Sequence, residues 1–441
     1  MTLINSIPKI LLPVAMSFKE ASMDIHDKTI KRLAGKSLKE LYGFYFDVLF
    51  DGFLPFWEKG GLDNKFGGII CELNEDGNIE TDEKTITFQG RGLWLYSYLF
   101  NFFGGDSWLE NAKNIHEFML NHMYVGKGRW YEKVTRQGQP TSGVGIDVFG
   151  WLFAAGGLIQ YYKALGNDED LKLAKESILA GLAKYDMANY TGVEIESSSG
   201  IKTNNLSLRS QGHSMVIIWM LTELLSFMQD DDLEKIQAQH VDHLINRFWN
   251  EEYGISNEYL KHDYSRSENT YWYMFTGHSI EVMWMLLHEA IRKKDKQLFD
   301  KVSDRLKTLL DKSWDKEYGG IGSEHYFAID RPGYPRGQNY NMKTMWTHTE
   351  ILIGCLTVLE YTGADWVADY YNRAFEFTLR TMPKPQHGVW RQAVDRQGND
   401  IKRPEFSIYR KDNFHQPRFL MLNMLSLDRL IKNNGKLTVF E

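Results

Sequence analysis

The chain has 441 residues, of which 43% are hydrophobic and 14% aromatic, and its formal net charge is −7. An acidic chain does not attract a polyanion, so we expect no nucleic-acid partner. Two cysteines, Cys71 and Cys355, exclude a disulfide framework and a cysteine-rich metal site and favour a cytoplasmic location, and no apolar run reaches the roughly 18 residues of a membrane span.

Residues 1–30 are predicted to form an N-terminal extension. Lys9 is followed by the apolar stretch ILLPVAM, which a proline interrupts and which is at the short limit for a signal peptide. Export is therefore the minor alternative to the cytoplasm. No Pro/Ser-rich or charged linker divides the rest of the chain, so we expect a single domain over residues 31–435.

A short glycine-centred stretch recurs six times along the chain. The stretches are NKFGGII (64–70), GKGRWYE (126–132), NYTGVEIE (189–196), EEYGISNE (251–258), KEYGGIGSE (316–324) and QHGVWRQA (386–393). Their central glycines are Gly68, Gly128, Gly192, Gly254, Gly320 and Gly388, which follow one another at nearly constant intervals. Several continue into a second turn, at 74–78, 135–139 and 395–400. Glycine beside Asn or Asp supplies the positive φ that hairpin turns need.

Helical patterns fill the segments between these turns. Six segments are apolar on almost every side, as expected of buried helices: 91–103, 147–165, 213–228, 278–291, 348–362 and 415–431. Others carry apolar residues at i, i+3, i+4 and i+7, as expected of half-exposed helices: 170–186, 295–315 and 365–382. Each unit of about 65 residues therefore holds one outer helix, a glycine hairpin and one inner helix.

Six such units predict an all-α fold, an (α/α)6 toroid of six helical hairpins with short β-hairpin turns. An open solenoid would need polar capping helices at both ends. The last helical segment, which ends at residue 431, is not polar, so the closed ring is favoured.

Polar and ionisable residues stand at the start of each inner helical segment. In chain order they are Arg91, Asp147, His213, His278 with Glu281, His348 with Glu350, and His415 with Arg418. In a six-unit ring these residues meet at one end, which we call the mouth. Helix N-termini add partial positive charge there, which favours oxygen-rich ligands and a developing oxyanion.

A purely structural origin does not explain histidine at four comparable places, because burying polar groups is costly. Asp147 is the exception, since it can equally be a helix cap. The remaining histidines considered, His116, His122, His240 and His243, fall on outer helices and are predicted to lie at the surface.

Three chemistries fit histidines, arginine and carboxylates at one mouth. No H-E-x-x-H or similar ligand spacing occurs, so we expect neither a metal nor a cofactor. Glycoside hydrolysis needs two carboxylates about 5–9.5 Å apart, which Asp147, Glu281 and Glu350 could supply. Proton transfer beside a carbonyl needs two bases of near-neutral pKa and a cation for the oxyanion, and histidines with arginine suit this best. A sugar-binding toroid without enzymatic activity is the non-enzyme alternative.

The residues also resemble a known superfamily. Residues 56–78, FWEKGGLDNKFGGIICELNEDGN, and 88–100, FQGRGLWLYSYLF, are similar to those of N-acylglucosamine 2-epimerases. That superfamily includes cellobiose 2-epimerases and mannose isomerases. GHSIE (277–281), WTHTE (346–350) and NFHQPR (413–418) match three more of its landmarks in order and spacing, so the resemblance spans about residues 35 to 430. By motif it is closest to N-acylglucosamine 2-epimerase.

The resemblance implies roles for individual residues. The paired acid/base histidines of the family fall on His278 and His415. Its substrate-binding residues fall on Arg91, Trp57, His213, Glu281, His348, Glu350 and Arg418.

The resemblance further implies an isomerase that interconverts N-acylglucosamine and N-acylmannosamine through an enediolate, with a small sugar as its partner and with a homodimer as the family habit. An aldose–ketose isomerase and a cellobiose 2-epimerase stay open, with a glycoside hydrolase more remote. Residues 322–345, rich in Gly, Tyr and Arg, are expected to form either a lid over the mouth or a long surface connection, with the lid favoured.

Overall fold

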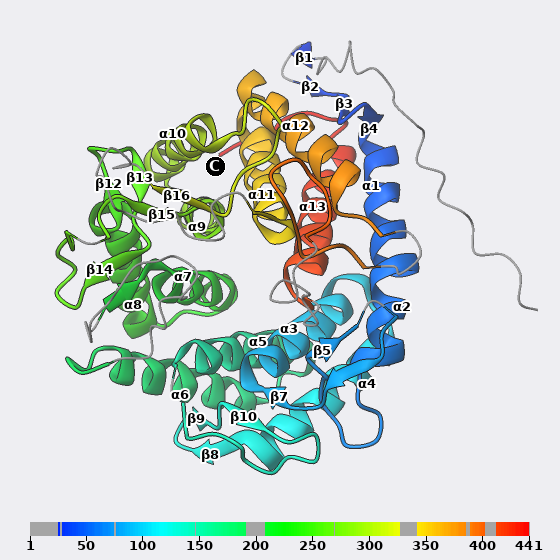
Figure 1. Ribbon diagram of the computed structural model, residues 1–441, viewed down its shortest axis with the longest axis vertical. Coiled ribbons are helices and arrows are strands. Elements are labelled where there is room, and N and C mark those ends of the chain that lie inside the picture. The colour runs from blue at the N-terminus through cyan, green and yellow to red at the C-terminus, as the bar shows by residue number, and fades with distance from the viewer. Residues whose placement is uncertain are drawn as a thin grey trace, which may run out of the picture.

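The computed structural model describes residues 25–26, 29–74, 76–145, 147–190, 208–268, 270–326, 342–384, 389–401 and 412–440. The inner helices are α3 (Ile86–Phe103), α5 (Phe149–Leu165), α7 (Gln211–Leu225), α9 (Thr276–Lys293), α11 (Met345–Thr362) and α13 (His415–Lys432). The outer helices are α1 (Leu38–Asp47), α4 (Asp106–Phe118), α6 (Asp168–Tyr185), α8 (Asp231–Asp242), α10 (Lys296–Ser313) and α12 (Asp365–Thr381). The predicted toroid of helical hairpins is confirmed, and Figure 1 shows the pairs following one another around a ring.

Each inner helix contacts the next along the chain, and each packs against one outer helix. The inner helices are buried nearly all round, whereas the outer helices bury one face, as the two apolar patterns predict. The inner helices begin earlier than expected in some units: α3 begins at Ile86, five residues before Arg91. Short π-helical turns, η2 (Trp57–Gly61), η3 (Met119–Met123) and η5 (His243–Arg247), end three of the outer segments. A further π-helical turn, η1 (Val48–Phe53), and the short α2 (Leu54–Phe56) continue α1.

The two ends of the chain close the ring. The outer helix α1 packs against α13, as Figure 1 shows on its right side. The Ile30 N–H donates to the Gly435 carbonyl at 2.7 Å, and the Asn413 side chain donates to the Phe88 carbonyl at 3.2 Å. These contacts join the first units of the chain to the last, so ring closure depends on both termini of the fold. The boundaries 1–30 and 31–435 stay a prediction.

Two-stranded antiparallel sheets occupy the connections. Their pairs are β1 (Ile25–His26) with β2 (Thr29–Ile30), β3 (Arg32–Leu33) with β4 (Lys36–Ser37), β5 (Glu72–Leu73) with β6 (Ile79–Thr81), β7 (Lys84–Thr85) with β10 (Lys133–Val134), β8 (Tyr124–Gly126) with β9 (Arg129–Trp130), β11 (Leu208–Ser210) with β14 (Tyr259–Lys261), β12 (Trp249–Asn250) with β13 (Ile255–Ser256), β15 (Tyr273–Phe275) with β16 (Glu324–Tyr326), and β17 (Lys343–Thr344) with β18 (Ala393–Val394).

Four of these sheets join neighbouring units. β7, β11, β15 and β17 each lead directly into an inner helix, and each pairs with a strand in the connection that precedes the next inner helix. The starts of adjacent inner helices are therefore held to one another at the mouth. The other sheets are hairpins within a unit.

The recurring glycines lie in these turns with positive φ. The φ angles are +76° at Gly68, +67° at Gly128, +59° at Gly254 and +72° at Gly320. Gly192 and Gly388 lie outside the described residues. The second turns also form, since the Asn74, Thr135 and Asp395 N–H groups donate to carbonyls four residues later. The turn predictions are confirmed wherever the structure describes them.

Three histidines predicted to be exposed are buried. His116 contacts Asp170 with 2.7 Å between Nε2 and Oδ1, and His240 Nδ1 lies 3.0 Å from the Ser214 hydroxyl. His243 is stacked on Tyr264. The prediction was wrong because these residues lie on the inward stripe of their outer helices and not on the solvent stripe. None of the described helices is long and apolar enough to cross a membrane.

We expect Gly128→Ala to destabilise the fold strongly. A Cβ at Gly128 would lie 2.2 Å from the Glu176 carbonyl oxygen, in addition to the left-handed backbone cost of about 1–2 kcal/mol. Gly166→Ala is the matched control, because Gly166 has φ +69° but a Cβ there would have no neighbouring atom within 4 Å. Chemical denaturation should show a larger loss of unfolding free energy for Gly128→Ala; equal losses would contradict the close approach.

Candidate active site

The polar residues at the mouth occupy different positions in their helices. His213 and His278 are third in α7 and α9, His348 is fourth in α11, and His415 is first in α13. Arg91, Glu281 and Glu350 are each sixth in their helices. Residues three apart share a helix face, whereas one position turns a side chain by about 100°. His278 therefore shares a face with Glu281, and His348 points elsewhere. The expectation of four equivalent histidines was wrong.

A buried ion cluster joins α9, α11 and α13. Arg418 Nη2 donates to Glu281 Oε1 and, at 2.8 Å, to Glu350 Oε1. Glu350 also accepts from His415 Nδ1 at 2.9 Å and from Trp284 Nε1 at 2.6 Å. Burial raises the pKa of Glu350, but Arg418 and His415 offset this, so that the pKa lies below its usual value. Glu350 is therefore ionised and orients His415.

The same cluster has the donor set of a metal site. One atom each of Glu281, Glu350 and His415 lies within 4.8 Å of the other two. Arg418 already donates to both carboxylates, and their negative charge raises the pKa of its guanidinium, against the effect of burial. A cation would have to displace this arginine. The expectation of a metal-free and cofactor-free site stays a prediction.

His278 is held by a residue that the sequence analysis missed. Its Nδ1 lies 3.0 Å from Oε1 of Glu258, a carboxylate with 2% exposure in the turn before β14. An ionised carboxylate only accepts, so the His278 Nδ1 carries the hydrogen. Glu281, the carboxylate that shares a helix face with His278, contacts Arg418 instead. Glu258 is the last residue of the glycine-centred stretch EEYGISNE (251–258), but that stretch was interpreted only as a turn.

Trp346 lies between the two histidines. Its ring centroid is 5.6 Å from that of His278 and 5.2 Å from that of His415. Gly277 makes room for this indole, because a Cβ there would lie 2.1 Å from the Trp346 ring. Both imidazoles therefore border the same aromatic surface, and each has a carboxylate at Nδ1. Trp346 belongs to the WTHTE motif, but only the Glu and the His of that motif were singled out.

Arg91 lies beside the His415 end of the cluster. Its guanidinium is 4.3 Å from the Phe153 ring centroid and 5.0 Å from that of Phe414. Asp412 accepts hydrogen bonds from the backbone N–H groups of Phe414 and His415. Burial raises the pKa of Asp412, but the charges of His415 and Arg91 bring it below the usual value. Arg91 and His415 therefore share an acidic neighbour.

Asp147 is both a helix-start residue and a partner of His213. Its Oδ1 accepts from the Phe149 N–H at 3.0 Å, from His213 Nε2 at 2.9 Å and from the Tyr190 hydroxyl at 2.7 Å. Burial raises the pKa of Asp147, and His213 lowers it below the usual value. Gly212, which precedes His213, lies beside His278, since a Cβ on Gly212 would be 3.2 Å from the His278 ring.

His348 is hydrogen-bonded to backbone groups through both ring nitrogens, and its assignment to substrate binding stays a prediction. Its Nδ1 donates to the Thr344 carbonyl at 2.7 Å, and its Nε2 accepts the Ile321 N–H at 3.0 Å. The side chain is fully buried, which lowers its pKa to about 4. Gln89, also fourth in its helix, accepts the Ile69 N–H in the same way. In α3 and α11 the fourth residue thus secures the glycine hairpin.

Trp57 is buried in the core, and its assignment to substrate binding stays a prediction. It lies in η2 with 1% exposure and packs against Phe53, Phe56 and Gly61. The aromatic-rich motif around it was read as site-lining because it resembles the family, but its ring is turned into the core. The predicted lid falls largely on residues 327–341, which lie outside the described residues.

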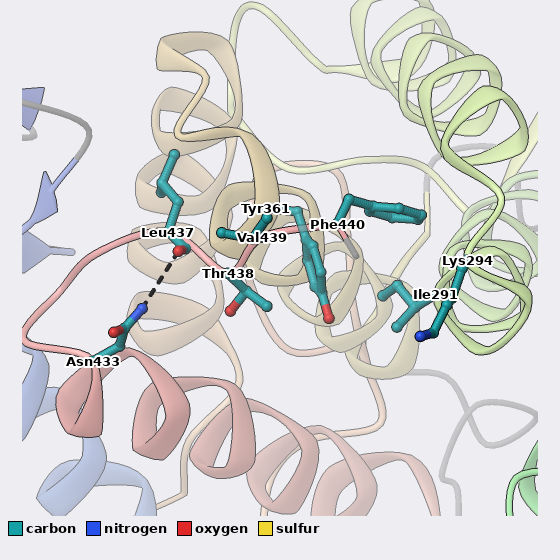
Figure 2. A pocket seen from close by; sticks show the side chains of 8 residues that line it. All are labelled: Ile291, Lys294, Tyr361, Asn433, Leu437, Thr438, Val439 and Phe440. Carbon is teal, nitrogen blue, oxygen red and sulfur yellow. Dashed lines mark hydrogen bonds between the residues drawn. The ribbon is translucent and has the colours of Figure 1, made fainter.

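Two cavities lie away from this cluster. One, of about 420 Å³, lies at the opposite ends of α9 and α11, where Lys294, Tyr361 and Phe440 line it (Figure 2). The other, of about 490 Å³, lies beside Asp63 and Arg136. None of the predicted site residues lines either cavity. The side-chain cluster of α9, α11 and α13 is therefore the candidate active site.

Most of the chain is similar to proteins of known family and structure. A family model described as N-acylglucosamine 2-epimerase (GlcNAc 2-epimerase) matches residues 67–411. N-acylglucosamine 2-epimerase of Mus musculus is 26% identical over 84% of this chain and 88% of its own length. Cellobiose 2-epimerase of Dictyoglomus turgidum is 24% identical over 87% of this chain and 98% of its own. The structure of cellobiose 2-epimerase from Bacillus thermoamylovorans B4167 has a TM-score of 0.74 at 17% identity and covers 88% of this chain and 99% of that chain.

We expect the unfolding free energy to fall as the pH is lowered from about 6.5 towards 4, in part through His348. Its pKa of about 4 in the folded chain lies below the ordinary value of about 6.5, so the unfolded chain binds one more proton in this range. Linkage gives a loss of up to about 1.4 kcal/mol per pH unit for one such histidine.

His348→Gln tests this assignment, because glutamine can accept the Ile321 N–H as Gln89 accepts its counterpart but cannot titrate. Denaturation at a series of pH values should show a shallower loss for this variant. His348→Ala, which leaves the Ile321 N–H without its acceptor, should lose about 1–3 kcal/mol at neutral pH and should also show the shallower pH dependence. An unchanged pH dependence in His348→Gln would contradict the structural role.

Proposed function

Because the chain belongs to the N-acylglucosamine 2-epimerase family, we propose that it is an isomerase that interconverts N-acylglucosamine and N-acylmannosamine. The observation that carries this proposal is the pair His278 and His415, each with a carboxylate at Nδ1 and both bordering Trp346. Two bases around one surface suit removal of a proton from one face of a carbon and its return to the other.

The reaction begins with the open-chain sugar, whose C1 aldehyde makes the C2 hydrogen acidic. One histidine takes the C2 proton, and the bonding electrons form an enolate, which is an enediolate where C2 carries a hydroxyl. The other histidine gives a proton to the opposite face of C2, and the C1 aldehyde is restored. One proton is taken and one is given, so the step is balanced without an oxidant or a cofactor.

The surrounding residues support this transfer. The Arg91 guanidinium supplies positive charge on the side of the developing oxyanion. Glu350 orients His415, and Arg418 in turn holds Glu350 and Glu281. His213, bonded to Asp147, follows Gly212, which lies beside His278, and its proposed role is to meet a substrate hydroxyl. Glu281 and Glu350 support the site through Arg418 and do not need to touch the sugar themselves.

Aldose–ketose isomerisation and cellobiose 2-epimerisation are the alternatives with the same intermediate. If the proton returns to C1, the product is a ketose. If the substrate is the disaccharide cellobiose, the reaction is the one in the name of the Dictyoglomus turgidum relative. Glycoside hydrolysis fits less well, because it needs a protonated acid. Arg418 binds both Glu281 and Glu350 and favours their ionised forms, and Asp147 is bonded to His213.

A cytoplasmic location and a homodimer belong to the same proposal. The structure forms no disulfide between Cys71 and Cys355, which are both buried, and this fits a reducing compartment. The homodimer is proposed from the habit of the family. Cell fractionation and sedimentation of the purified chain test the two points.

We expect exchange of the C2 hydrogen in heavy water. N-acetylmannosamine and N-acetylglucosamine should take up deuterium at C2, and the same panel with mannose and cellobiose separates the alternatives. Mass spectrometry and proton NMR measure the label and identify the products. A lack of exchange with all four sugars would remove the proton-transfer proposal, and release of reducing sugar from an oligosaccharide would favour a hydrolase.

We expect His278→Asn and His415→Asn each to lower net epimerisation by about 10²- to 10⁴-fold, because each histidine serves one face of C2. Each variant should still exchange the C2 hydrogen of the one epimer that faces its remaining histidine. His122→Asn is the control, since His122 lies on η3, away from the cluster. Near-normal turnover in both variants, with a native melting temperature, would remove these histidines from catalysis.

A further inference from the structure

Glu258 is a buried carboxylate that neither the motifs nor the family resemblance singled out. Its Oε1 accepts from the Ser210 hydroxyl at 2.7 Å and from His278 Nδ1 at 3.0 Å. Its Oε2 accepts from Gln211 Nε2 at 2.7 Å. With 2% of the residue exposed, these hydrogen bonds replace most of the water that a carboxylate would otherwise bind.

The donors around Glu258 are themselves held in place. Ser256 donates from its hydroxyl to Gln211 Oε1 at 2.7 Å, and the Gln211 backbone N–H donates to the Glu258 carbonyl at 3.0 Å. Ser210 pairs with Tyr259 in the sheet of β11 and β14, which places Glu258 beside the start of α7. The carboxylate therefore has one orientation, and it presents Oε1 to His278.

The negative charges of Glu258 and Glu350 are compensated by different groups. Among the described residues, the cationic partner within ion-pair distance of Glu258 is His278. Glu350 instead divides its charge between His415 and Arg418. A buried carboxylate is stable only when its charge is compensated. A proton on His278 is thus the compensation available to Glu258, whereas Glu350 keeps Arg418 when His415 is neutral.

We propose that Glu258 is the positioning residue of His278: it fixes the Nδ1–H tautomer, directs Nε2 to the substrate, and stabilises the imidazolium that forms when His278 takes the C2 proton. This inference rests on the proposed function. The two histidines then differ in their surroundings. Among the described residues, His278 is the cationic partner within ion-pair distance of Glu258. Glu350, the partner of His415, also binds the permanently charged Arg418.

Other ionisable groups on the elements packed around His278 have partners of their own. Glu281 on α9 and Glu350 on α11 bind Arg418 of α13, and His213 on α7 binds Asp147. His325 of β16 contacts the Thr276 hydroxyl at 2.8 Å, and burial lowers its pKa to about 4, so it is neutral. Further ionisable groups on neighbouring elements are Glu324 of β16 and His415 of α13. Glu258 is hydrogen-bonded to His278 itself.

Glu258→Gln tests the inference. It removes the negative charge and places an amide against His278, so we expect kcat to fall about 100-fold or more while KM changes little. In the direction in which His278 takes the proton, the acidic limb of the kcat/KM profile should move to lower pH, because the imidazolium loses its counter-charge. Glu258→Asp restores the charge at a shorter reach and should recover the position of that limb, with kcat between the two.

Glu289→Gln is the matched control. Glu289 is also on α9 and 3% exposed, but it binds Arg292 and Thr222 at the other end of the helix. This variant should lose stability and keep both kcat and the pH profile. If Glu258→Gln keeps the wild-type acidic limb, or if it changes only the melting temperature as Glu289→Gln does, the inference is overturned. If Glu258→Gln does not fold, kcat of Glu258→Asp decides: a lowered kcat with a native melting temperature supports the inference, and a wild-type kcat overturns it.

Failure of the proposed function gives a different result. In that case the wild-type chain exchanges no C2 hydrogen, and no pH profile of exchange exists for any variant. Exchange by the wild type together with an unmoved limb in Glu258→Gln removes the role of Glu258 alone.

Discussion

One guanidinium nitrogen holds the mouth of this toroid together. Arg418 Nη2 on α13 donates to Glu281 on α9 and to Glu350 on α11, and all three side chains are almost fully buried. Burying a single carboxylate or guanidinium costs several kcal/mol unless an opposite charge accompanies it. Each of these three side chains therefore requires the other two. The first turns of α9, α11 and α13 must lie close enough together for all three to meet. His415 is oriented by this cluster, because Glu350 accepts its Nδ1 hydrogen bond while Arg418 balances the charge.

The ring supplies the geometry that this cluster needs. A helical hairpin alone cannot bury its inner helix, so each unit depends on both neighbours. The two-stranded sheets at the mouth add a second constraint, since each ties the start of one inner helix to the connection before the next. The β11–β14 sheet brings Glu258 to His278 in this way, and the β17–β18 sheet sets the start of α11. Long loops can then vary without moving the inner-helix starts relative to each other.

The repeat of glycine turns and apolar segments was enough to predict the toroid, since both signals are local and recur with a constant period. The site was predictable only where two residues share one helix face, as His278 shares a face with Glu281 and His415 with Arg418. His348 faces the glycine hairpin because α11 begins three residues before it, which the sequence pattern did not reveal. Glu258 could not be found, because its contact with His278 depends on pairing between β11 and β14. Trp57 shows the same limit: resemblance placed it near the site, and packing in η2 turned its ring into the core.

The central claim is that two histidines act on opposite faces of C2. An isotope label on the substrate tests this claim most directly. N-acetylmannosamine with deuterium at C2 should be converted in ordinary water, and the C2 position of the N-acetylglucosamine product analysed by mass spectrometry at low conversion. Transfer between two separate bases predicts a product whose C2 hydrogen comes from the solvent, with no deuterium retained. Deuterium retained at C2 of the inverted product would show that one base both takes and returns the hydrogen, and would contradict the paired roles of His278 and His415.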